Sequence, residues 1–220
     1  MEIDELFVKY QKEQYFDYLF DKYGLSMDKL NSLEYLRREK VLKDEEELKA
    51  HLIDYINLGY KLYTSEGMYY YLIDYQKIID AFSKNITNEY NDYLKILALD
   101  TNQPFMNDGS LTISMDSLAE RILMVESFKM LYPYSDLLPE IKNIYNNYIY
   151  TFFFGDNHDP NFNLDTFVMK DEIIQEYKKT IEKYEYTSFA NIIRDFMEYL
   201  KANNNVVDDE IRAKLEDRLD

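Results

Sequence analysis

The residues best suited to bind a ligand in this sequence lie in a tyrosine-rich segment, residues 59–75. If the segment is helical, three successive side chains point in three directions, so at least one ring faces outward or into a groove. Flanking carboxylates would stand at the lip of such a groove. The candidate ligand-binding residues here are Glu66, Tyr69, Tyr70, Tyr71 and Asp74.

A purely structural interpretation of the same segment stays open. Gly59 on the inner face of a helix permits close approach of a second helix, and Glu66-Gly67 breaks the helical pattern. The segment would then be a helical hairpin whose tyrosine hydroxyl groups form hydrogen bonds at its edges.

The loop at residues 155–165 is rich in oxygen donors, which are the ligands that calcium prefers. Its register fails the EF-hand pattern, however. Counted from Asp159, position 6 is Leu164 rather than Gly, and position 12 is Lys170 rather than Glu. We therefore predict no metal site and a helix-to-helix connection built from turns and caps. The residues that come nearest to a metal site are Asp156, Asp159 and Asn161.

Arg121 is the remaining candidate, because it stands in a part of the chain with few positive charges. Residues 51–165 hold 7 Lys and Arg against 16 Asp and Glu. Arg121 is expected to anchor a buried ion pair, and the alternative is a role in binding an anion.

No catalytic signature is present. His51 and His158 lack the spacing of a zinc site, no Gly-x-Ser-x-Gly surrounds a serine, and no glycine-rich phosphate loop occurs. Carboxylate pairs such as Glu120 and Glu126 are what 42 acidic residues produce by chance. We assign no catalytic residue and no cofactor.

Composition restricts the partners. The 220 residues include 23 Tyr, no Cys and no Trp, with a formal net charge of −17. Such a surface repels nucleic acid and anionic lipid. No apolar run reaches the length of about 18 to 20 residues that a spanning helix needs. The first 25 residues do not have the pattern of a signal peptide.

Helical periodicity dominates the chain, and only 5 Gly and 4 Pro interrupt it. Ser26 and an Asp44/Glu47 capping box start two of the helices, Ser114 or Asp116 starts another, and Gly155 ends one. Asp108-Gly109 predicts a tight turn beside a brief strand at 111–113. Segments with helical signals cover residues 2–23, 26–42, 44–63, 68–82, 87–97, 114–131, 135–154, 169–185, 188–203 and 207–219.

These elements predict an all-α fold, an irregular antiparallel bundle of eight or nine helices. We expect a single domain over residues 1–220, with any junction between two lobes near residues 100–113. Helix lengths do not recur at a fixed period, which excludes a regular solenoid.

Two runs of residues carry a resemblance to a known family. The first run is Gly59-Tyr60, Glu66-Gly67-Met68-Tyr69-Tyr70 and Ile73-Asp74-Tyr75. The second is Asp108-Gly109-Ser110-Leu111, Leu118-Ala119-Glu120-Arg121, Glu126, Tyr132-Pro133 and Gly155-Asp156-Asn157. Over about residues 45–165, these runs resemble uncharacterised helical ectodomains of Gram-positive cell-envelope proteins and lipoproteins. The resemblance implies an exported, all-helical module and carries over no functional residue.

The leading functional hypothesis is a non-enzymatic binding or structural domain at the bacterial cell envelope. Its Tyr-lined groove would contact a protein, a glycan or a cell-wall component. The first alternative is a cytoplasmic acidic regulator that occupies basic surfaces, as nucleic-acid mimics do. A carboxylate-based hydrolase is the second, and it would require two carboxyl groups that converge in one pocket.

Overall fold

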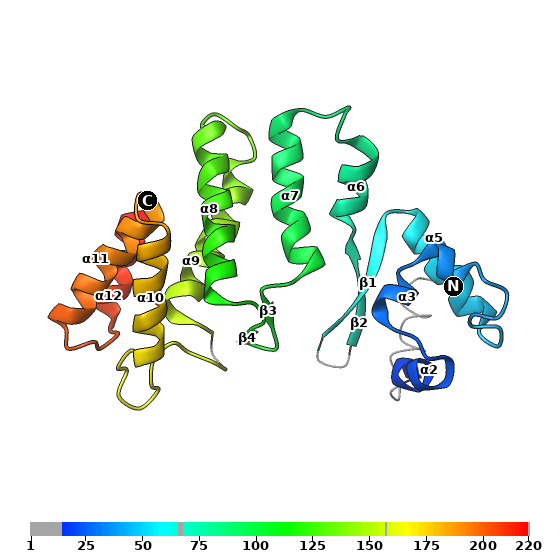
Figure 1. The fold of residues 1–220 in the computed structure, drawn as a ribbon, viewed down its shortest axis with the longest axis horizontal. Coiled ribbons are helices and arrows are strands. Elements are labelled where there is room, and N and C mark those ends of the chain that lie inside the picture. Colours follow the sequence, from blue (N-terminus) through cyan, green and yellow to red (C-terminus); the bar gives the residue numbers. More distant parts are fainter. Residues whose placement is uncertain (1–14, 66–67, 157, 220) are drawn as a thin grey trace. The chain divides into compact units, whose positions relative to one another are not determined.

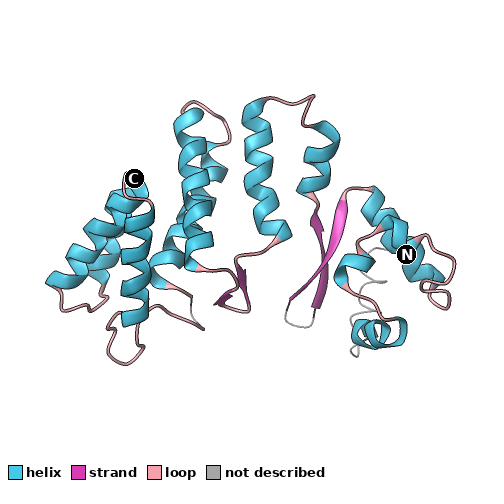
Figure 2. Ribbon diagram, viewed as in Figure 1, coloured by secondary structure: helices cyan, strands magenta, loops and turns pink. Residues whose placement is uncertain are grey.

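The computed structural model describes residues 15–65, 68–156 and 158–219, and its fold is mostly helical (Figure 1). Figure 2 shows the few strands between the helices. Within the described residues the sheets are two small two-stranded ones, so the predicted helical fold class is confirmed. None of the described helices combines the length and apolar character needed to cross a lipid bilayer.

The described residues group into two compact units, whose boundaries fall before Asn88, within α7 (Asn88–Asn102) after Ile96, and after Gln103. Residues 88–96 of α7 belong to the second unit, and residues 97–103 belong to the first. The first unit also holds α2 (Tyr15–Tyr23), α3 (Met27–Leu30), α4 (Leu33–Leu36), α5 (Glu46–Asn57), β1 (Tyr60–Ser65), β2 (Met68–Ile73) and α6 (Tyr75–Phe82). The second also holds β3 (Met106–Asn107), β4 (Ser110–Leu111), α8 (Met115–Leu131), α9 (Leu138–Phe154), α10 (Asp171–Lys183), α11 (Ser188–Ala202) and α12 (Asp209–Leu219).

In the first unit, β1 and β2 form an antiparallel hairpin where the sequence predicted helices over 44–63 and 68–82. That part of the prediction was wrong. Helix α5 ends at Asn57, and Gly59 follows with a φ of +91°, a left-handed conformation that glycine adopts readily. The residues beyond it are rich in tyrosine, which suits a pleated, half-buried strand.

The hairpin covers the core of the first unit with one face. Leu62 pairs with Tyr71, and Leu62 and Tyr69 are both buried. The Asn31 side chain pairs with the outer edge of β1: the Leu62 N–H donates to Asn31 Oδ1 at 2.6 Å, and Asn31 Nδ2 donates to the Leu62 carbonyl at 2.8 Å. This core comprises Leu19, Leu30, Leu36, Leu42, Leu48, Leu52, Ile56, Leu62 and Tyr69.

The helices that precede the hairpin are shorter than predicted. The helix expected at 26–42 is two single turns, α3 and α4, because the Ser32 side chain caps a new helix within it. The predicted capping box at Asp44 does not form, since Asp44 accepts a hydrogen bond from the Tyr23 hydroxyl instead. Of the helix predicted at 2–23, the part before Tyr15 lies outside the described residues.

The second unit follows the predicted pattern closely. The Ser114 side chain caps α8, Pro139 lies in the first turn of α9, and Gly155 ends that helix. The Asp108-Gly109 turn joins β3 to β4. The largest fully buried side chains of this unit include Phe128, Tyr148, Phe152, Phe153, Tyr177, Phe189 and Phe196.

The carboxyl end of α9 is buried and its last carbonyl groups are paired. Asn161 Nδ2 donates to the Phe152 carbonyl at 2.9 Å, and the Asn161 backbone N–H donates to the Phe154 carbonyl at 2.9 Å. The hydroxyl of the fully buried Tyr177 donates to the Phe153 carbonyl at 2.8 Å. These bonds satisfy groups that the helix itself leaves without a partner.

The loop after α9 turns sharply to bring Asn161 back to the helix end. Gly155 has a φ of +72°, and a Cβ built there would lie 2.4 Å from the Asp159 carbonyl oxygen. Any larger residue at this position would push the loop, and Asn161 with it, away from α9.

Replacing Asn161 by Ala should lower the free energy of unfolding by about 1 to 3 kcal/mol, because the buried Phe152 carbonyl loses its donor. Urea unfolding followed by far-ultraviolet circular dichroism measures the change. The matched control is Asn143→Ala, an exposed position on α9, which should change stability by less than about 0.5 kcal/mol. Equal stability of the two variants would contradict the capping role.

Candidate functional site

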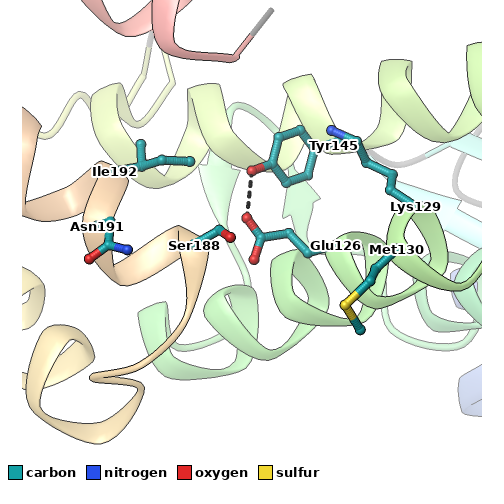
Figure 3. Close-up of a pocket in the computed structure, with 7 residues that line it drawn as sticks. All are labelled: Glu126, Lys129, Met130, Tyr145, Ser188, Asn191 and Ile192. Atoms are coloured by element: carbon teal, nitrogen blue, oxygen red, sulfur yellow. Dashed lines mark hydrogen bonds between the residues drawn. The ribbon is translucent and has the colours of Figure 1, made fainter. Parts of the chain in front are cut away.

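A cavity of about 440 Å³ lies between α8, α9 and α11 in the second unit (Figure 3). Two helices line it with the same spacing, i, i+3 and i+4, which places three side chains on one helical face. The lining residues are Glu126, Lys129 and Met130 from α8, Tyr145 from α9, and Ser188, Asn191 and Ile192 from α11.

Glu126 is the half-buried carboxylate of the cavity. Figure 3 shows its carboxyl group between Tyr145 and Ser188. The Tyr145 hydroxyl donates to Glu126 Oε1 at 2.9 Å, and the backbone N–H of Phe189, in the first turn of α11, donates to the same carboxylate. Burial raises the pKa of Glu126 above its ordinary value, while these two hydrogen bonds and the charge of Lys129 act in the opposite direction.

Lys129 is the cation of the cavity. Its Nζ lies 4.3 Å from the centre of the Tyr145 ring, so it interacts with the aromatic face. Burial lowers the pKa of Lys129, Glu126 raises it, and the neighbouring Lys142 lowers it further. The cavity therefore brings a carboxylate and an ammonium group into a partly desolvated setting, where charges interact more strongly than in water.

The tyrosines predicted to line a groove lie on strand β2 instead of a helix. Successive side chains on a strand alternate between its faces. Tyr69 is 6% exposed and belongs to the core, and Tyr71 stacks on Tyr55 with ring centres 4.0 Å apart. Burial raises the pKa of Tyr71. Tyr70 lies on the opposite face against Tyr63, with ring centres 5.6 Å apart.

The two carboxylates predicted to flank that groove have different outcomes. Asp74 caps α6, since its Oδ1 accepts a hydrogen bond from the Lys77 backbone N–H at 3.2 Å. Glu66 lies outside the described residues. The hairpin thus uses Tyr69, Tyr71 and Asp74 in packing and capping.

Arg121 is 5% exposed on α8 and belongs to the second unit, whereas the tyrosines of β2 belong to the first. It is not one of the residues that line the cavity. A buried guanidinium requires partners inside the protein, and the role of Arg121 as the anchor of an ion pair stays a prediction.

Asp156, Asp159 and Asn161, the weak candidates for a metal site, each make other contacts. Asn161 caps α9, Asp159 forms an ion pair with Lys170 at 3.1 Å, and Asp156 donates its backbone N–H to the Asp159 carbonyl. Among the described residues, no three His, Asp or Glu side chains come together as a metal site would require. His158 packs beside Gly109.

The sequence analysis did not predict the cavity: it treats Glu126 as one of many carboxylates and does not single out Tyr145. The repeated spacing of 126/129/130 and 188/191/192 was visible, but nothing in the sequence indicated that these two faces meet.

No protein-family model, no curated protein and no solved structure matches this chain. Function must therefore be inferred from the geometry of the cavity.

The pKa of Glu126 should lie above 4.5, the ordinary value for glutamate, and Tyr145→Phe should raise it further. The variant loses a hydrogen bond that favours the charged carboxylate. Carbon-detected NMR titration of the Glu126 side chain measures both values. Tyr134→Phe, at a position that is 97% exposed, should leave the pKa of Glu126 unchanged, and an unchanged value in Tyr145→Phe would contradict the assignment.

The raised pKa of Glu126 makes the free energy of unfolding depend on pH. Because the folded state holds this proton more tightly than the unfolded state, its stabilising contribution is complete below pH 4.5. It is lost as pH rises through the raised pKa. Glu126→Gln keeps an oxygen acceptor for Tyr145 but has no proton to lose. The difference in unfolding free energy, variant minus wild type, should therefore grow as pH rises through this window.

Proposed function

We propose that this chain is a non-enzymatic binding protein whose ligand occupies the cavity between α8, α9 and α11. The observation that supports this proposal is that one carboxylate, Glu126, and one ammonium group, Lys129, both half-buried, line a space of about 440 Å³. Binding sites for small molecules commonly have this size and a few convergent polar groups.

A binding role is favoured over a carboxylate-based hydrolase by the composition of the cavity wall. Acid–base hydrolysis of that kind needs two carboxyl groups whose environments push their pKa values apart. Among the described residues that line the cavity, Glu126 is the one carboxylate. Its principal neighbours are a tyrosine and a lysine.

A binding role is also favoured over mimicry of nucleic acid. A mimic needs carboxylates in a continuous stripe, whereas here lysines alternate with them on the helix surfaces. Lys183 lies 2.8 Å from Asp116 and 3.3 Å from Glu120, and it joins α10 to α8. Ion pairs within single helices include Asp92–Lys95, Glu176–Lys179 and Glu210–Lys214.

The bacterial cell envelope remains the proposed location, on the basis of the sequence resemblance alone. The volume of the cavity restricts the size of the ligand that can occupy it. We propose a low-molecular-weight ligand, free or as the end group of a larger glycan or cell-wall component, instead of a broad protein surface.

A tryptophan at the cavity rim should report ligand binding, because the chain has no tryptophan of its own. Met130 lines the cavity and is 75% exposed, so Met130→Trp should fold normally. Screening small anions, cations and neutral molecules against this variant should identify compounds that change its fluorescence saturably. Leu164→Trp, in the loop after α9, is the control and should not respond to the same compounds.

A screen in which no compound changes the Met130→Trp signal would contradict the proposed function. Because the introduced tryptophan could itself obstruct the cavity, methyl NMR of the wild-type chain is the second readout. A ligand in the cavity should shift the Ile192 methyl signals. Failure of both readouts would remove the cavity as a binding site.

A further inference from the structure

The ammonium group of Lys129 lacks a strong acceptor. In the part of the chain that the structure describes, it makes no hydrogen bond and no ion pair. Its contact is the face of the Tyr145 ring, with Nζ 4.3 Å from the ring centre. A half-buried ammonium group is better stabilised by an anion than by a ring face or partial hydration.

Glu126 does not supply that anion directly. Its carboxylate is held by the Tyr145 hydroxyl and by the Phe189 backbone N–H. These bonds orient it toward α9 and the first turn of α11. Lys129 feels its charge without forming an ion pair.

A second cation, the exposed Lys142 on α9, lies outside the cavity wall but near Lys129. Residues 51–165 hold only 7 Lys and Arg, and one of them, Lys142, is close enough to Lys129 to lower the pKa of Lys129 by repulsion. An anion that reaches this point relieves the repulsion between the two lysines.

The rest of the cavity wall combines apolar and polar side chains. Met130 and Ile192 supply apolar surface, and Ser188 and Asn191 supply hydroxyl and amide groups. A ligand that fits has one charged end and an apolar body. Glu126 would repel a second negative charge, so a dianion such as phosphate fits less well than a monoanion.

We propose that the cavity binds a small aliphatic monocarboxylate, whose carboxylate contacts the Lys129 ammonium group and whose tail lies against Met130 and Ile192. This inference rests on the proposed function and specifies its ligand class. Because the Glu126 carboxylate is held by its own hydrogen bonds, the Lys129 ammonium group is left available to the ligand.

The test compares hexanoate with its neutral isostere hexanamide and with hexylamine, using methyl NMR titration of the full chain. Hexanoate should bind and shift the Ile192 and Met130 methyl signals, and the other two should bind much more weakly. Lys129→Met keeps the aliphatic stem and removes the charge. It should weaken hexanoate binding on the order of ten-fold to one-hundred-fold, the effect of losing a charge-assisted hydrogen bond.

Two further variants make the result specific. Lys129→Arg keeps the charge and should retain most of the affinity, which separates loss of charge from loss of fold. Lys201→Met removes a lysine that lines a different groove, between α10 and α11, and should leave hexanoate binding unchanged.

Equal binding of hexanoate and hexanamide, or an unchanged affinity in Lys129→Met, would overturn the ligand class. So would the absence of hexanoate binding. If hexylamine or a neutral compound then binds with shifts at Ile192, the proposed function survives while this inference fails. If the wider screen also yields nothing, both fail.

Discussion

The second unit depends on how the buried carboxyl end of α9 is satisfied. Three successive carbonyl groups there would be costly if they were left unpaired away from water. Asn161 and Tyr177 take all three, one from the loop after α9 and the other from α10. These carbonyl groups belong to Phe152, Phe153 and Phe154, whose rings lie in the aromatic core of the unit. Hydrogen bonding and packing therefore act together to hold the end of α9 in place.

The same centre positions the cavity. The Phe189 ring packs edge-on against Phe152, with ring centres 4.9 Å apart, and the Phe189 backbone N–H donates to Glu126. One residue thus links the aromatic core to the carboxylate of the site. Tyr145, two and a half helical turns before the end of α9 by spacing, holds the other side of that carboxylate.

Much of the second unit could be predicted from sequence, because its signals are local. Ser114 caps α8, Pro139 lies in the first turn of α9, and Gly155 ends it, as the pattern indicated. In the first unit the prediction was wrong at the segment that forms β1 and β2, which is rich in tyrosine and poor in strong helix formers. At residues 68–73 the apolar spacing fits a helix and a strand, and pairing with β1 decided the outcome.

The site could not be predicted in the same way, because the cavity forms only where particular faces of α8, α9 and α11 pack together. Glu126 and Ser188 are far apart in sequence, and burial of Glu126 follows only once α8, α9 and α11 are packed. The tyrosines drew attention because they are numerous. In the structure, Tyr69 and Tyr71 stabilise a core and Tyr145 contributes to the cavity by orienting one carboxylate.

The position of a bound ligand would test this account most directly. In a chain with labelled methyl groups, intermolecular NOEs from the terminal methyl of hexanoate should reach Met130 and Ile192. NOEs confined to Met197, in the groove between α10 and α11, or to methyl groups of the first unit would contradict it.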